Sequence, residues 1–107
     1  MSAIIVRKVD SSTGDPLQGA WFRVRFLGGT SGTGGTVIAE RQTSSNGTFI
    51  LTGLKAGTYV IEEISAPDGY VLSETIFRRY NLSGNEQDVI TVTFGNEAKG
   101  SVLIEKD

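Results

Sequence analysis

The clearest strand signature in this chain of 107 residues is ITVTFGN at residues 90–96. Apolar and polar residues alternate along it, and side chains two positions apart lie on the same face of a β-strand. The apolar face carries Ile90, Val92 and Phe94, and the next residue on that face is Asn96. The alternation therefore predicts a carboxamide that points toward the hydrophobic side of the strand.

Two further stretches end in the same way. In IIVRK at residues 4–8 the alternation leads to Lys8, and in YVIEE at residues 59–63 it leads to Glu63. An amine that faces a carboxamide beside a carboxyl is the reactant set for a self-formed amide crosslink between Lys and Asn, which releases ammonia. A neutral amine is the nucleophile, and a protonated carboxyl can donate to the amide oxygen and then pass the proton to the leaving ammonia.

An ordinary alternative exists for each of these residues. A polar side chain at the end of a strand usually places its head group in water. One bulge in the strand that carries Glu62 and Glu63 would also exchange the faces of these two residues. The alternation does not show that the three strand ends meet in space.

Period-two patterns and turn signals indicate an all-β protein. No segment has a helical period longer than two turns, and Asn46-Gly47 is typical of a β-hairpin between two strands. We predict a seven-stranded antiparallel β-sandwich of the immunoglobulin-like or prealbumin-like class. Its strands are expected at residues 3–10, 20–27, 36–43, 48–52, 58–64, 75–82 and 88–96.

Composition narrows the function classes. The net charge is −2 with interspersed signs, which predicts neither a nucleic-acid partner nor contact with a membrane. No apolar run is long enough to span a bilayer. The chain has no Cys and no His, so disulfides and thiolate metal sites are excluded, and no metal or cofactor is predicted.

Two segments lie outside the predicted sandwich strands. The Gly-rich stretch 28–35 precedes a strand rather than a helix, so a flexible loop is favoured over a phosphate-binding loop. Residues 101–106, SVLIEK, match residues 3–8, AIIVRK, in character at an offset of 98 (101 − 3). We therefore predict a domain at residues 1–98, and at 99–107 a linker and the first strand of a following similar domain. The alternative is a coincidental apolar tail.

Four motifs in order resemble the CnaB-type (collagen-adhesin B-repeat, prealbumin-like) domains of Gram-positive surface proteins and pilins over about residues 3–97. They are KVD at 8–10, LQGAWF at 17–22, NGTF at 46–49 and YVIEEISAPDGY at 59–70. The last is the most specific, because it is similar to the family pattern Y-x-L-x-E-x-x-A-P-x-G-Y. Many pilin versions have Thr directly after the Glu, whereas this chain has Ile64.

The resemblance implies a role for each of the three polar residues. The family's bonding Lys and Asn fall on Lys8 and Asn96, and its catalytic Glu falls on Glu63, in agreement with the strand alternation. In the family the first and last strands run side by side, which would bring the bonding pair together. The apolar surround that keeps water away is assigned to Phe22, Tyr59 and Phe94.

The function that follows is a structural stalk or repeat module of a Gram-positive adhesin or pilus-like protein, extracellular and flanked by similar domains. Such a domain would modify itself once and would not be an enzyme with turnover. The alternative is an adhesin module that binds a host protein or carbohydrate through Trp21, Tyr70 or Tyr80. An enzyme on a transthyretin-like fold is disfavoured, and Asp10 and Asp15 are interpreted as turn formers.

Overall fold

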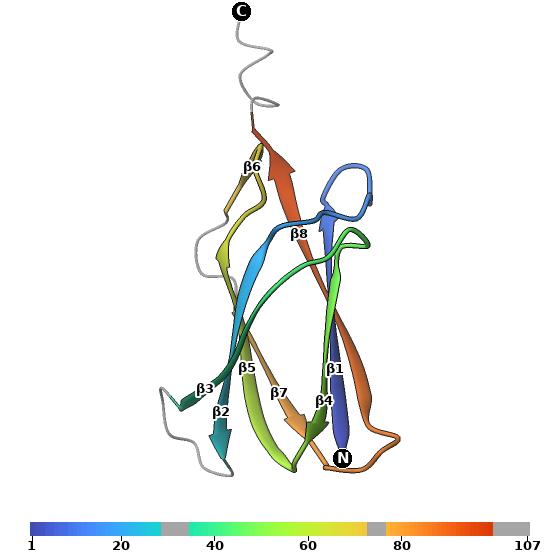
Figure 1. Cartoon of the computed structure of the whole chain (residues 1–107), viewed down its shortest axis with the longest axis vertical. Coiled ribbons are helices and arrows are strands. Elements are labelled where there is room, and N and C mark those ends of the chain that lie inside the picture. Colours follow the sequence, from blue (N-terminus) through green and yellow to red (C-terminus); the bar gives the residue numbers. More distant parts are fainter. Residues whose placement is uncertain (29–34, 73–76, 100–107) are drawn as a thin grey trace, which may run out of the picture.

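The computed structural model describes residues 1–28, 35–72 and 77–99 of the chain. These residues form an elongated β-sandwich of 52 × 27 × 17 Å (Figure 1). No helix within these residues is long and apolar enough to cross a membrane. The strands are β1 (Ser2–Asp10), β2 (Trp21–Gly28), β3 (Thr36–Gln42), β4 (Thr48–Leu54), β5 (Gly57–Ser65), β6 (Tyr70–Val71), β7 (Phe77–Leu82) and β8 (Val89–Ala98).

The strands form two four-stranded sheets with the orders β4-β1-β8-β6 and β3-β2-β5-β7. The prediction of an all-β sandwich is confirmed, and the two-residue β6 is an addition to the seven expected strands. One pairing differs from a purely antiparallel sheet, because β1 and β8 run parallel. Parallel neighbours need a long connection, and here the rest of the domain supplies it between the first and last strands.

The alternation of buried residues matches the alternation in the sequence. Every second residue of β1 from Ser2 to Asp10 is buried, as are Phe22 and Val24 on β2. The ring of Phe22 joins the two sheets, since its centroid lies 4.9 Å from that of Phe94 and 5.5 Å from that of Phe49. These inner faces form one hydrophobic core.

The turn at Asn46-Gly47 forms, but it is not the tip of a paired hairpin. Gly47 has a φ of +74°, and its N–H donates to Ser44 O at 2.8 Å. The strands on either side lie in different sheets, because β3 pairs with β2 whereas β4 pairs with β1. The hairpin prediction is therefore wrong at this point: the turn carries the chain from one sheet to the other.

Three predicted features lie wholly or partly outside the described residues. They are the loop at 28–35, of which 29–34 are not described, the first two residues of the strand predicted at 75–82, and the tail at 101–107. The division at residues 98 and 99 therefore stays a prediction.

Candidate functional site

Three strands place the predicted triad at the interface between the two sheets. Lys8 on β1 and Asn96 on β8 belong to one sheet, and Glu63 on β5 belongs to the other. Their exposed fractions are 0%, 1% and 7%, in that order, so the inward orientation predicted from the alternation is confirmed. In the parallel pairing of β1 with β8, Lys8 lies opposite Phe94. Asn96 is two residues farther along β8, on the same face as Phe94.

Glu63 contacts both of the other polar side chains through one oxygen. Its Oε1 is 3.6 Å from Lys8 Nζ and accepts a hydrogen bond from Asn96 Nδ2 at 3.3 Å. Among the described residues, the buried side-chain atoms that lack a hydrogen-bond partner are Lys8 Nζ, Glu63 Oε2 and Asn96 Oδ1. Native cores rarely leave buried polar groups unpaired, so three in one cluster require an explanation.

The environment suppresses charge on both ionisable members of the triad. Burial raises the pKa of the Glu63 carboxyl, against the opposing effect of the Lys8 charge and the Asn96 hydrogen bond. Burial likewise lowers the pKa of the Lys8 ammonium, although the Glu63 charge acts in the opposite direction. Both shifts favour a protonated carboxyl beside a neutral amine.

Two of the three residues predicted as the apolar surround lie at the triad. Phe22 lies opposite Glu63 in the β2–β5 register, and Phe94 lies opposite Lys8 in the β1–β8 register. Both are fully buried, with tilted rings in contact. They therefore form apolar walls on the two sheets that carry the triad.

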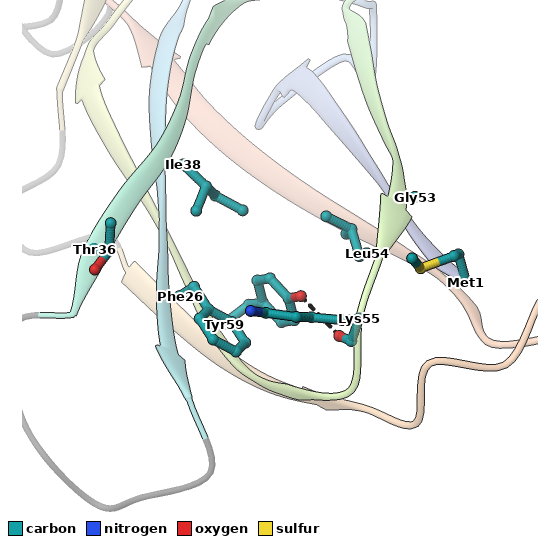
Figure 2. Close-up of a pocket in the computed structure, with 8 residues that line it drawn as sticks. All are labelled: Met1, Phe26, Thr36, Ile38, Gly53, Leu54, Lys55 and Tyr59. Carbon is teal, nitrogen blue, oxygen red and sulfur yellow. Dashed lines mark hydrogen bonds between the residues drawn. The ribbon is translucent and has the colours of Figure 1, made fainter.

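Tyr59 is also buried, but its contacts lie farther along β5. It precedes Glu63 by four residues, which is about 13 Å along a strand. Its ring lies 5.0 Å from that of Phe26, and its hydroxyl donates to Lys55 O at 2.7 Å. It lines an apolar hollow of about 400 Å³, together with Ile38 and Leu54 (Figure 2). The assignment of Tyr59 to the triad surround is thus corrected, since the alternation gives the face of a residue but not its height along the strand.

Arg78 is a further neighbour of the site, and it is not among the residues predicted from the sequence. It lies opposite Ile61 in the β5–β7 register, and its guanidinium carbon is 4.5 Å from the centre of the Phe94 ring. Its positive charge adds a smaller contribution to the lowered pKa of Lys8. In the sequence Arg78 comes two positions before Tyr80 and four before Leu82, so counting by twos assigns it to their face of the strand. This alternation does not identify Phe94 as its neighbour.

Asp10 is a turn former, as predicted, but it also has a distant partner. Its Oδ1 accepts hydrogen bonds from the N–H groups of Ser12 and Thr13 at 2.8 and 3.0 Å. Its Oδ2 accepts a hydrogen bond from the Tyr70 hydroxyl at 2.8 Å. These hydrogen bonds, that of Tyr70 first, lower the pKa of the Asp10 carboxyl.

We expect Tyr70→Phe to destabilise the domain at neutral pH and much less in acid. A carboxylate with a lowered folded pKa stabilises the fold above its unfolded pKa of about 3.9, and the effect is lost as pH falls through the lower folded value. Melting temperatures measured from neutral pH to below pH 3 should therefore converge for the variant and the unsubstituted chain. Tyr80→Phe is the control. If the melting temperatures of Tyr70→Phe and the unsubstituted chain differ by the same amount at neutral and acid pH, the role of Asp10 is contradicted.

No cluster of three or more His, Cys, Asp or Glu in the described part of the chain could hold a metal ion. The arrangement around Lys8, Glu63 and Asn96 is instead that of an amine, a carboxyl and a carboxamide in an apolar setting. The model of the SpaA prealbumin-like fold domain matches residues 2–98. This chain belongs to that family.

Relatives of this prealbumin-like domain are surface and pilus proteins. The trypsin-resistant surface T6 protein of Streptococcus pyogenes serotype M6 is 32% identical over 104 residues. The match covers 97% of this chain and 18% of that protein, so the chain spans about a fifth of its curated relative.

The same fold occurs in solved structures of pilus proteins. The backbone protein of group B streptococcus pilus 2b is 27% identical with a TM-score of 0.73, over 94% of this prealbumin-like domain and 42% of that chain. The T6 backbone pilin of serotype M6 Streptococcus pyogenes is 36% identical with a TM-score of 0.63, over 76% of this domain and 16% of that chain.

Proposed function

We propose that this domain is a structural stalk module of a Gram-positive surface or pilus-like protein, closed by a self-formed isopeptide bond between Lys8 and Asn96. The observation that carries the proposal is the buried, incompletely paired cluster of Lys8, Glu63 and Asn96. The surface and pilus proteins among the relatives support the extracellular location and the structural role. The domain would be joined to similar domains in the same protein.

The proposed reaction needs no external reagent. The neutral Lys8 amine attacks Asn96 Cγ, a C–N bond forms, and the bond from Cγ to Nδ2 breaks. Glu63 Oε1 lies 3.6 Å from the attacking nitrogen and 3.3 Å from the leaving nitrogen, so it is placed to carry the proton from one to the other. Ammonia leaves and one amide replaces the amine and the carboxamide. Folding supplies the high effective molarity, and the apolar walls exclude water.

The crosslink would keep mechanical load away from most of the domain. Figure 1 shows β1 starting at one end of the long axis and β8 finishing at the other, with the two strands side by side. Lys8 and Asn96 both lie near the C-terminal ends of their strands. Tension applied at the two ends of the domain would run along β1, cross the new amide and leave through Glu97 and Ala98. Residues 9–95 would bear no load.

Single-molecule stretching between the two ends tests this role. The loop closed by the crosslink spans 88 residues (96 − 8), so Lys8→Ala should release roughly 300 Å of extra chain on unfolding, and the unsubstituted chain should release none of it. Lys99→Ala, which removes an exposed amine, should behave like the unsubstituted chain. Equal extension of Lys8→Ala and the unsubstituted chain would contradict the stalk mechanism.

The aromatic residues considered for a ligand-binding role have separate settings. Trp21 is exposed at the start of β2, Tyr70 is tied to Asp10, and Tyr80 packs against the core. No contact between their rings is found in the described part of the chain. This dispersal supports the structural role over an aromatic binding platform.

A further inference from the structure

The backbone of Lys8 is held at both of its hydrogen-bonding groups. Its N–H donates to Gly47 O at 2.7 Å, and its carbonyl accepts from the Leu17 N–H at 2.9 Å. Gly47 belongs to the segment 43–47, here called the crossover turn, which leads from β3 in one sheet to β4 in the other. The residue that carries the reactive amine is therefore fixed by a connection between the sheets.

The crossover turn is anchored to the sheet that carries Glu63. Thr43 is 3% exposed, and its hydroxyl donates to Leu17 O at 2.8 Å and accepts from the Ala20 N–H at 3.0 Å. Ala20 directly precedes β2, and Phe22 on β2 lies opposite Glu63. A continuous series of hydrogen bonds thus links the Glu63 sheet to both sides of the Lys8 backbone.

Gly47 leaves no space for a side chain at this point. A Cβ placed there would lie 2.8 Å from Lys8 O, 2.8 Å from Pro16 Cβ and 2.9 Å from Leu17 N. Two of these atoms belong to the backbone hydrogen bond between Leu17 and Lys8, so they cannot yield without moving Lys8. Gly53 has a similar φ of +71°, but a Cβ there would meet nothing within 4 Å.

We propose that Thr43 and Gly47 of the crossover turn are positioning residues for the crosslink, setting the height of the Lys8 amine relative to Glu63 and Asn96. This inference rests on the proposed function. Neither residue touches the reacting atoms. Both act through the backbone of Lys8, and the amine reaches its place only when the two sheets have come together. The crosslink would then form late in folding and seal an already assembled sandwich.

The test follows crosslink formation in freshly translated chain, quenched at intervals and measured by intact mass as the loss of one ammonia. A misplacement of about 1 Å costs roughly 100-fold in rate, so Gly47→Ala should slow the reaction to about that degree. Gly53→Ala imposes the same backbone strain without the clash and should react like the unsubstituted chain. The shape of the pH–rate profile should stay unchanged in Gly47→Ala, because burial of Lys8 and Glu63 is retained.

If Gly47→Ala does not fold, Thr43→Val tests whether the crossover turn positions the Lys8 amine. It keeps the shape of the side chain and removes both hydroxyl hydrogen bonds, so it should slow the reaction, whereas Thr58→Val, whose hydroxyl bonds the exposed Asn81, should not. Circular dichroism identifies the folded variants. A folded Gly47→Ala or Thr43→Val that reacts as fast as its control would overturn the inference. An unsubstituted chain that never loses ammonia would instead reject the proposed function.

Discussion

Replacing Glu63 with Gln is expected to leave the fold intact and to abolish the crosslink. Gln has nearly the same size as Glu, but it has no acidic proton to transfer from the attacking amine to the leaving nitrogen. The variant should keep its full sequence mass. By analogy with a disulfide that closes a loop of 88 residues (96 − 8), it should also lose about 4–5 kcal/mol of unfolding free energy. This corresponds to roughly 20–30 °C in melting temperature.

The matched control is Glu62→Gln. Glu62 adjoins Glu63 but points outward, where it pairs with Arg23 and Arg25 at 3.7 and 3.3 Å. Partly exposed ion pairs contribute at most about 1 kcal/mol each, so this variant should melt close to the unsubstituted chain and lack one ammonia, as that chain does. A Glu63→Gln protein that still loses ammonia would remove Glu63 from the mechanism, even if the bond itself is real.

The second large effect is expected for Phe22→Ala. The Phe22 ring is fully buried, contacts Phe94 and Phe49 in the other sheet, and lies opposite Glu63. Its removal should cost about 3–5 kcal/mol of unfolding free energy through lost burial and the remaining cavity. Water entering that cavity should also slow the crosslink, because a hydrated amine and carboxyl return toward their charged forms.

Chemical denaturation and intact mass measure the two consequences of Phe22→Ala separately. Trp21→Ala is the control. Trp21 is adjacent to Phe22 but 42% exposed, so its replacement should change the unfolding free energy and the crosslinking little. If Phe22→Ala unfolds at the denaturant concentration of the control, the ring does not hold the sheets together. If it is destabilised but reacts at the normal rate, the apolar wall is not needed for the chemistry.

Local alternation is sufficient to predict which face of its strand each residue of the candidate site occupies. The faces of Lys8, Glu63 and Asn96 follow from counting by twos along β1, β5 and β8, because no bulge intervenes between the apolar residues and the polar one. The same counting places Phe22 and Phe94 inside. That the three strand ends meet does not follow from the alternation, because it depends on the order of the strands in the two sheets.

What the sequence did not predict depends on contacts between distant segments. Asn46-Gly47 specifies a tight turn, but which strand pairs with β4 is decided by β1, far away in the chain. Tyr70 reaches Asp10 across 60 positions, and Arg78 reaches Phe94 from the edge strand β7. Turn chemistry and period-two patterns specify local geometry and carry no information about these partners.

The covalent bond from Lys8 to Asn96 is tested most directly by mass spectrometry of the purified, unsubstituted chain. The intact mass should fall short of the sequence mass by one ammonia, and a digest should contain one branched peptide that joins Lys8 to Asn96. Lys8→Ala should restore the full mass, and Lys99→Ala should retain the deficit. An unsubstituted chain with its full sequence mass and separate Lys8 and Asn96 peptides would contradict the account.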